Sequence, residues 1–420
     1  MRIAHVAYRY LPRLGGLEMY IDQLRDALAP LAGDQPVYQC ANGTEEEGVV
    51  SLKTRSLTPL KLINFNAALF GKRRELSRYD LVIVHNPEHF GSWIDPAKAL
   101  VVSHGATWTH ESGGPRRWLR LRAMHAAFRR AKAVVANDSF VLREMGIQVE
   151  AGTHFGEEIV PGRWFIPNAI DTRVFAPGKQ RATTADKFGV GRTSSTDERV
   201  VASSAADAGS VASSAAAAGS VANSAADEFL PPALRAHDCG PIVLVPRNLS
   251  YSRGIDIAVR AIAASKTLPP DAQLLVTGQA IPDVPASVAY ARELESLADE
   301  LGVRNRVHFL GGLTREQMRR LYLRTALTLV PTRCSEGTSL AALESMASGC
   351  ATLCSGVEGL LDLPGPHTTP DPVAFARRID EVWDTRPQLA EAQRTQVLRD
   401  FDTALWGERW RRAVQSLVRA

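Results

Sequence analysis

The stretch ALTLVPTRCSEGTSLAALESMASGCATLCSG, residues 326–356, contains a complete strand–helix–strand unit. Its apolar ends, ALTLVPTR and CATLCSG, are typical of buried strands. Between them, Thr338 or Ser339 provides a helix start and Gly349 provides a helix stop. A helix that connects two buried strands is the repeating unit of a parallel sheet with helices on both faces. The stretch therefore predicts a doubly wound α/β fold.

The predicted helix has an unusual distribution of charge. Glu336 and Glu344, eight positions apart, are the two charged residues of the segment 335–349. At about 100° per residue, Glu344 falls at the margin of the apolar face. That face contains Leu340, Leu343, Met346 and Ala347, whereas the positions best placed for solvent are Ala341, Ala342 and Ser345. The single acid of the helix is thus expected beside the core.

The same helix start is suited to an anionic ligand. Backbone N–H groups at a helix N-terminus bind phosphate, and Gly337 permits a close approach. Glu344 is expected about 9 Å further along the axis, at 1.5 Å per residue. A carboxylate there suits the two hydroxyls of a ribose whose diphosphate sits at the helix start. The alternative is that Glu344 lies at the edge of the packing face and Glu336 favours the helix N-terminus.

Composition sets broad limits. The chain of 420 residues is long enough for two domains, and its net charge of +4 favours an anionic small molecule or a lipid surface over nucleic acid. Five cysteines without a CxxC pair argue against a disulfide framework and a zinc site. The sequence contains no signal-peptide core and no apolar run of about 18 residues. We expect a cytoplasmic location, with contact at the inner face of the plasma membrane.

Short apolar strands alternate with helices along both halves of the chain. We predict an N-terminal domain over residues 1–172 and a C-terminal domain over 173–400, joined by a turn-rich hinge at 167–177, with a final helix at 401–420 returning to the first domain. The expected strands are residues 2–8, 80–86, 99–105 and 131–138 in the first half, and 241–248, 272–279, 306–312, 326–333 and 350–356 in the second. Expected helices are about 16–31, 256–265, 285–301 and 315–324.

A low-complexity segment interrupts the second domain. VASSAADAGSVASSAAAAGSVANSAADEF, residues 201–229, is a near-perfect ten-residue repeat with almost no large apolar side chains. Such a segment cannot bury enough surface to offset its ordering entropy. We predict a flexible insertion over about 192–230 and assign it no chemistry.

Several motifs together indicate a family. PTRCSEGTSLAALESMASGCATLCS (331–355) resembles the E-x7-E element of glycosyltransferase family 4. LPRLGGLEMYIDQL (11–24), WFIPNAIDTRVFAPG (164–178) and PRNLSYSRGIDIAVRAI (246–262) are similar to its glycine-rich first loop, its hinge entry and its basic phosphate-binding loop. The resemblance covers nearly the whole chain except the repeat. It implies the GT-B fold, two Rossmann-like domains facing across a cleft, and retaining transfer from a nucleotide sugar.

The resemblance also implies roles for individual residues. Glu344 is expected to bind the ribose, and Glu336 is expected to position the transferred sugar. The diphosphate is expected at the helix start, on the groups around Gly337, Thr338, Ser339 and Leu340.

The basic loop departs from the family pattern. Arg253 precedes Gly254 and replaces the family's lysine, whereas Asn248 occupies the family's arginine position and Arg247 lies one residue early. Cations are needed there because negative charge builds on the leaving diphosphate. Which of the two arginines contacts the diphosphate stays open, and the alternative is that both are solvated charges at the rim of the loop.

Two further elements of the first domain are expected at the cleft. Gly15 and Gly16 lie between the first strand and helix, where side chains would block a phosphate or an acceptor. His104 resembles the family's first-domain histidine, which contacts the donor sugar or the reacting centre. His85 is the competing histidine, and we favour His104.

We expect no metal and no cofactor besides the donor substrate. The one DxD triplet, DFD at 400–402, falls in the C-terminal helical region. The acceptor side combines apolar and basic residues at 61–74 and 113–132, which suits docking on an anionic membrane and a glycan or lipid-linked acceptor. The alternative for both segments is a core-packing amphipathic helix.

These observations predict a retaining glycosyltransferase that moves a sugar from a nucleotide diphosphate to an acceptor hydroxyl in polysaccharide, glycolipid or cell-envelope glycan synthesis. The alternatives are a non-catalytic GT-B scaffold and a GT-B epimerase or phosphorylase.

Overall fold

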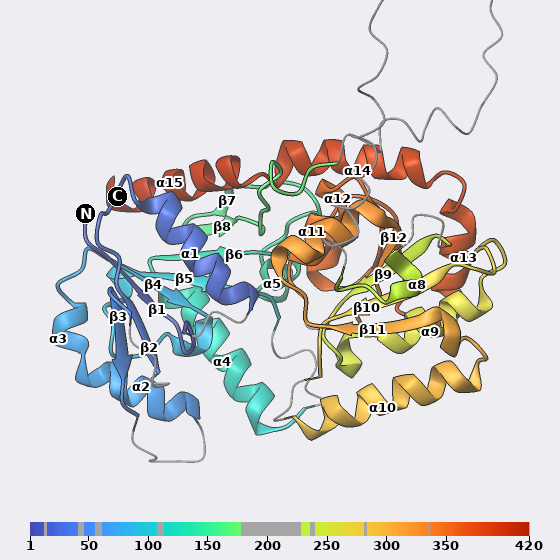
Figure 1. Ribbon diagram of the computed structural model, residues 1–420. Coiled ribbons are helices and arrows are strands. Elements are labelled where there is room, and N and C mark those ends of the chain that lie inside the picture. The colour runs from blue at the N-terminus through green and yellow to red at the C-terminus, as the bar shows by residue number, and fades with distance from the viewer. Residues whose placement is uncertain are drawn as a thin grey trace, which may run out of the picture.

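The computed structural model contains two parallel sheets side by side (Figure 1). It describes residues 1–11, 15–40, 46–54, 61–106, 113–177, 228–235, 240–280, 284–334 and 336–419. The predicted insertion at about 192–230 lies outside these residues except for 228–230. The statements below refer to the described part of the chain.

The first sheet has eight strands, all parallel except β7, which is antiparallel to β8. Their spatial order is β3 (Val49–Leu52), β2 (Val37–Cys40), β1 (Ile3–Val6), β4 (Leu81–His85), β5 (Ala99–Ser103), β6 (Ala133–Ala136), β8 (Arg163–Phe165) and β7 (Glu157–Val160). Its helices are α1 (Gly16–Leu28), α2 (Lys61–Gly71), α3 (Arg73–Leu76), α4 (Pro115–Arg130) and α5 (Ser139–Glu144).

The second sheet has six parallel strands. Their order is β11 (Val307–Gly311), β10 (Gln273–Thr277), β9 (Ile242–Pro246), β12 (Thr325–Val330), β13 (Ala351–Ser355) and β14 (His367–Thr368). Its helices are α8 (Pro232–Arg235), α9 (Ile255–Ala264), α10 (Pro285–Glu300), α11 (Arg315–Arg324), α12 (Leu340–Ala347), α13 (Pro372–Val382) and α14 (Arg386–Asp400).

Each predicted strand is present. These strands could be predicted because a strand that is buried along its whole length, such as IVLVP in β9, has a continuous apolar sequence. The prediction was incomplete. The edge strands β3, β7 and β14 and the interior strand β2 were not predicted, and Arg163–Phe165, expected as part of a turn-rich segment, forms the interior strand β8. The helix expected at 16–31 ends at Leu28. Strands β3, β7 and β14 are short and partly exposed, so their periodicity is weak, whereas β2 is a mostly buried strand of four residues.

The final helix α15 (Thr403–Arg419) lies along the first sheet beside α1, in red above the blue and green elements of Figure 1. Its Trp406 and Trp410 are buried in one apolar cluster with Leu24 and Ile83. At the start of α15, the Thr172 hydroxyl donates to the Asp402 carboxylate at 2.5 Å and Ile170 N–H donates to the Phe401 carbonyl at 2.9 Å. These hydrogen bonds therefore attach the start of α15 to the segment that connects the two sheets.

Candidate functional site

A cavity of about 350 Å³ lies between the two sheets, at the carboxyl ends of their central strands. Open α/β sheets bind ligands at this edge, because the loops that follow parallel strands meet there. Residues from both halves of the chain line the cavity: Gly16, Leu17, Tyr20, His104, Asn137 and Asn168 from the first half, and Arg247, Arg253, Glu336, Gly337, Thr338, Ser339, Leu340 and Ala341 from the second.

The start of α12 forms one wall. Strand β12 delivers the chain into this helix, whose N-cap is Ser339 and whose first helical residue is Leu340. The Ser339 side chain makes no capping hydrogen bond, and its hydroxyl instead accepts from Arg247 at 3.2 Å. Within the described chain, the first-turn N–H groups of α12 thus lack a side-chain cap at the cavity. An uncapped helix N-terminus with its positive dipole end is an anion site.

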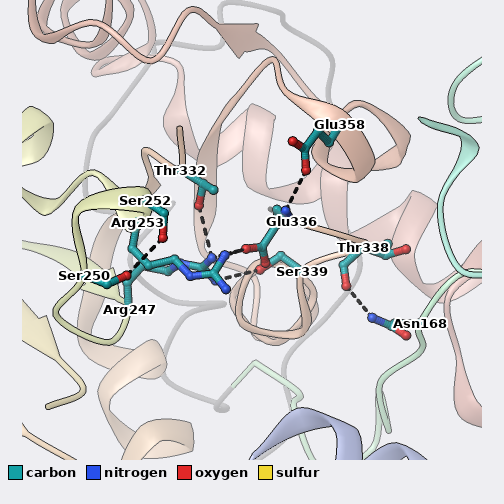
Figure 2. A network of polar contacts seen from close by, with 10 residues as sticks. All are labelled: Asn168, Arg247, Ser250, Ser252, Arg253, Thr332, Glu336, Thr338, Ser339 and Glu358. Atoms are coloured by element: carbon teal, nitrogen blue, oxygen red, sulfur yellow. Dashed lines mark hydrogen bonds and ion pairs between the residues drawn. The ribbon is translucent and has the colours of Figure 1, made fainter. Parts of the chain in front are cut away.

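Two arginines and one glutamate form a charged cluster beside the helix start (Figure 2). Arg247 and Arg253 both form ion pairs with the Glu336 carboxylate, and Arg247 also donates to the Thr332 hydroxyl at 3.1 Å. The Glu336 side chain is 9% exposed, as is that of Arg247. Burial disfavours the ionised carboxyl, but the charges of Arg247 and Arg253 outweigh it and hold the pKa of Glu336 below its ordinary value.

This cluster has two cations for one anion. Arg247 Nε is buried and has no hydrogen-bond partner within the described residues. The Glu336 N–H donates to the Glu358 carboxylate at 2.8 Å, which fixes the backbone of this glutamate. An anion that entered the cavity would therefore meet guanidinium groups already in place.

The two halves of the chain are in direct contact at the floor of the cavity. The Asn168 amide donates to the Thr338 carbonyl at 2.6 Å (Figure 2). The Thr338 hydroxyl donates to the Asn137 carbonyl. A Cβ added to Gly105, whose φ is +102°, would lie 3.0 Å from Gly337 N. Glycine is needed on both sides of this contact, because side chains would separate the two walls.

Three more hydrogen bonds close the same junction. The Asp362 carboxylate accepts the Ser139 N–H at 2.8 Å, the Ser139 hydroxyl at 2.6 Å and the Gly152 N–H at 3.0 Å. The neighbouring Asp138 is fully buried, and its Oδ2 has no hydrogen-bond partner within the described residues. Burial, with the carboxylates of Asp362 and Glu358 nearby, raises the pKa of Asp138 to about 8.

Among the first-domain histidines that the structure describes, His104 lines the cavity. Its Nε2 lies 3.2 Å from Nδ1 of His85, and its ring packs edge-on against Tyr20 with 4.6 Å between ring centroids. Burial lowers the pKa of His104 to about 3. His85, the competing residue of the sequence analysis, is fully buried and does not line the cavity.

The environment of α12 differs from the expectation. Ala342 and Ser345, predicted to face solvent, are fully buried, whereas Leu340, Ala341 and Glu344 are partly exposed. The prediction failed because α12 packs against β13 on one side and against α14 on another, so a single apolar stripe does not describe its core contacts.

Glu344 thus lies on the least buried face of the helix. Its carboxylate accepts from the Tyr322 hydroxyl at 3.2 Å, and burial raises its pKa to about 7.

The structure brings most of the predicted site residues to one cavity. Gly16, His104, Arg247, Arg253, Glu336, Gly337, Thr338, Ser339 and Leu340 line it, whereas Gly15, Asn248 and Glu344 do not. Gly15 is the N-cap of α1, and the Asn248 side chain accepts from the Gln279 N–H at 3.4 Å.

Part of the lining was not predicted. Leu17, Tyr20, Asn137 and Ala341 were not singled out, and Asn168 lies in the turn-rich hinge expected at 167–177. Asn137 follows strand β6 directly, so the rule that ligands sit at the carboxyl ends of strands could have indicated it. Tyr20 carries no such signal, because it lies within a helix.

The described residues contain no group of three or more His, Cys, Asp or Glu side chains arranged to hold a metal ion. Asp400 and Asp402 of the DFD triplet lie at the junction of α14 and α15. In the same part of the chain, every helix is too short or too polar to cross a bilayer.

Part of the chain and its overall fold resemble those of known glycosyltransferases. Residues 227–396 match the family model described as glycosyl transferases group 1. An uncharacterized glycosyltransferase from Methanocaldococcus jannaschii is 30% identical over 132 residues, which are 31% of this chain and 31% of that protein. The alignment thus spans about a third of that relative's length.

Two solved structures share the fold over nearly the whole chain. Sucrose-phosphate synthase from Thermosynechococcus elongatus has a TM-score of 0.69 at 18% identity, covering 99% of this chain and 98% of that one. Anabaena HepE in complex with UDP-glucose has a TM-score of 0.65 at 17% identity, covering 99% of both chains. The predicted fold is therefore confirmed: the chain has the two-domain GT-B fold, and residues 227–396 of its second half match the glycosyl transferases group 1.

Proposed function

We propose that this protein is a glycosyltransferase that moves a sugar from a nucleotide diphosphate to an acceptor hydroxyl with retention of configuration. The observation that carries the proposal is the charged wall of the cavity. Arg247 and Arg253 stand beside the uncapped start of α12, so two guanidiniums and a helix dipole face the same space. A diphosphate matches this arrangement, because each of these groups stabilises negative charge.

The same groups would assist the reaction. The bond from the anomeric carbon to the diphosphate oxygen breaks, and the leaving diphosphate gains charge that Arg247 and Arg253 stabilise. The acceptor oxygen forms its bond on the same face, and its proton passes to the departing phosphate. Glu336, held between the two arginines, positions the sugar in this proposal and is not assigned as a nucleophile.

The donor extends from this wall in two directions. We place the ribose toward Glu344, further along α12, and the sugar toward the neutral first-domain wall with His104 and Asn137. The match of residues 227–396 to glycosyl transferases group 1 supports a nucleotide-sugar donor, and so do the UDP and UDP-glucose complexes of the similarly folded HepE. No divalent metal is required in this proposal, because the arginines and the helix dipole supply the positive charge.

A panel of nucleotide sugars tests the donor assignment. Thermal-shift measurements should identify one nucleotide sugar that raises the melting temperature, and EDTA should not abolish the shift. Release of free nucleotide diphosphate that depends on an acceptor would support transfer, and NMR of the product would give the anomeric configuration. A requirement for inorganic phosphate would indicate a phosphorylase. Stabilisation without turnover across a broad acceptor panel would indicate a non-catalytic scaffold.

We further propose a glycan or lipid-linked acceptor of cell-envelope synthesis, used at the cytoplasmic face of a membrane. Helices α2 and α4 both contact the 3₁₀ turn Pro87–His89 and expose large apolar side chains. Phe70 is 45% exposed under the guanidinium of Arg73, and Trp118 is 55% exposed under that of Arg122. Apolar side chains with basic neighbours suit an anionic bilayer surface.

Vesicle flotation tests this second proposal. The protein should float with vesicles that contain anionic lipid at low salt and should remain at the bottom with neutral vesicles. Trp118→Asp should reduce flotation, whereas Val373→Asp, a matched change at a position that is 73% exposed in the second domain, should leave it unchanged. Absence of flotation at low salt would contradict membrane contact.

A further inference from the structure

Three histidines form a continuous hydrogen-bonded chain through the first sheet. His5 and His85 lie on the neighbouring strands β1 and β4, and His104 directly follows the next strand, β5 (Figure 1). Nδ1 of His5 is 3.1 Å from Nε2 of His85, and Nδ1 of His85 is 3.2 Å from Nε2 of His104. The first two are fully buried, and His104 is the member that lines the cavity.

The three imidazole rings approach one another through the edges that carry their nitrogen atoms. The centroids of His5 and His85 are 5.4 Å apart with 17° between ring planes, and those of His85 and His104 are 5.4 Å apart with 20°. Centroids this far apart, with nitrogens about 3 Å apart in nearly parallel rings, exclude face-to-face stacking. The geometry is that of successive N–H···N hydrogen bonds, whose direction depends on where each proton sits.

Gln35 fixes the direction at the buried end. Its Nε2 donates to the Arg25 carbonyl at 2.7 Å and to the Ala32 carbonyl at 3.1 Å. Because both partners are acceptors, this atom must be the amide nitrogen. The other amide atom, Oε1, therefore lies 3.2 Å from Nε2 of His5. An amide oxygen only accepts, so His5 carries its proton on Nε2.

The proton position on His5 then determines the direction of the hydrogen bonds between the other rings. Burial lowers the pKa of His5 to about 4 and that of His104 to about 3, and it lowers the pKa of His85 well below the ordinary value. All three rings are neutral near pH 7, so each has one proton. With its proton on Nε2, His5 accepts at Nδ1 from His85 Nε2–H, and His85 in turn accepts at Nδ1 from His104 Nε2–H.

We infer that Gln35, His5 and His85 are positioning residues that hold His104 as the Nε2–H tautomer, so that Nδ1 of His104 offers a lone pair to a hydroxyl of the ligand in the cavity. Within the described residues, His104 has one hydrogen-bond partner, His85, and Nδ1 has none. Edge-on contact with Tyr20 restrains the ring further. The buried trio thus presets an acceptor on the neutral wall, three hydrogen bonds away from Gln35.

The functional consequence rests on the proposed glycosyltransferase activity. A sugar hydroxyl that donates to Nδ1 would face a donor if the tautomer reversed. Loss of one such hydrogen bond should reduce kcat/KM by about tenfold. The tautomer of His104 can be measured without substrate. The inferred histidine hydrogen-bond relay (Gln35, His5, His85 and His104) and the proposed function can therefore fail independently.

NMR of protein labelled with ¹⁵N-histidine provides the test. In long-range ¹H–¹⁵N spectra at about pH 7, the signals that disappear in His104→Phe should report a neutral ring with its proton on Nε2. Gln35→Met removes the acceptor that sets the direction, so a second His104 signal with the proton on Nδ1 should appear. Gln39→Met is the matched control, because Gln39 is equally buried but bonds to Ser51 and Leu11.

A wild-type His104 with its proton on Nδ1 would overturn the inference, as would a doubly protonated ring. A folded Gln35→Met protein with an unchanged His104 signal would also overturn it. If Gln35→Met does not fold, His5→Phe removes the same directional constraint from His85, and the same two outcomes decide. If no nucleotide sugar is turned over while the tautomers are as expected, the proposed function fails and the relay stands.

Discussion

The two walls of the cavity differ in chemical character. The second-domain wall is charged: Arg247 and Arg253 surround Glu336 at the start of a helix whose dipole adds positive potential. The first-domain wall is neutral: His104 is held uncharged by burial, and its neighbours Asn137 and Asn168 are amides.

The difference indicates how a ligand is oriented. An anionic group gains most against the charged wall, where guanidinium groups are preorganised. Hydroxyl groups gain most against the neutral wall, where acceptors and donors have fixed directions and the lining side chains that the structure describes are uncharged. A sugar nucleotide has both kinds of group, which is why the comparison of the walls supports the proposed function.

Removing a cation from the charged wall should have the largest effect. Arg247→Ala is expected to lower kcat/KM for the donor by about 10²–10³, because one preorganised donor to the leaving group is lost. Steady-state kinetics with the donor found by thermal shift measure this. Arg333→Ala is the control, since Arg333 pairs with Asp256 outside the cavity lining. Equal losses for both variants would contradict the special role of the charged wall.

Removing the negative charge of Glu336 from the same wall should have opposite effects on the sugar and on the diphosphate of the donor. Glu336→Gln is expected to lower kcat by about 10², because sugar positioning is lost. The affinity for the nucleotide diphosphate without sugar should rise, since both guanidiniums lose their internal partner. Calorimetric titration with UDP, the nucleotide bound in the HepE complex, measures this second effect. Weaker UDP binding in the variant would count against competition between Glu336 and phosphate.

Glu344, further along α12 from the charged wall, should give donor binding a pH dependence. Burial raises its pKa to about 7, so the carboxylate form increases as the pH rises through that value. A carboxylate accepts ribose hydroxyls more strongly than a neutral group does. Donor affinity should therefore increase by about tenfold from pH 6 to pH 8.

Glu344→Gln should flatten this pH profile. Tyr322→Phe removes a hydrogen bond that lowers the pKa of Glu344, and should move the increase to higher pH. An unchanged profile in Glu344→Gln would reject the ribose assignment.

The smallest expected effect concerns the junction of the two walls. Asp138 has a pKa of about 8 in the folded protein against an ordinary value of 3.8. Between these values the unfolded chain releases the proton that the folded protein keeps, so this group lowers stability as the pH rises from about 4 to about 8. Asp138→Asn should raise Tm by about 2–4 °C at high pH and by less near pH 5.

The asparagine keeps the acceptor that caps α5 through the Val141 N–H. Asp371→Asn is the matched control, because Asp371 caps α13 in an exposed position. Differential scanning calorimetry at several pH values measures both variants. A gain of stability that does not depend on pH would contradict the assigned pKa.

Much of the fold could be predicted because local sequence patterns, namely apolar runs and helix-capping residues, indicate its strands and helices. The buried strands β1, β4, β5, β9 and β12 are continuous apolar runs, and the helix between β12 and β13 is bounded by Ser339 and Gly349. Edge strands such as β3 were missed because they are short and mostly half-buried, so that their pattern resembles that of loops.

The site was predictable only where a motif marks it. Glu336 and Glu344 are recognisable by their spacing, and Arg253 by its position before Gly254. The choice between Arg247 and Arg253 was left open, and the structure places both on Glu336. Side chains from a loop converge on one atom only when the loop is folded, so sequence position could not decide between them.

By itself, the sequence determined the alternation of strands and helices, the helix start that faces the cavity and the two glutamates on either side of that start. The tertiary structure decided the neutral wall. Asn168 meets Thr338 across 170 positions of the chain, and His5 meets His85 across 80. Such contacts depend on the packing of whole sheets and domains, since no local preference of the backbone links residues so far apart. For the same physical reason, Gln35 could be connected to His104 only through three hydrogen bonds in the folded protein.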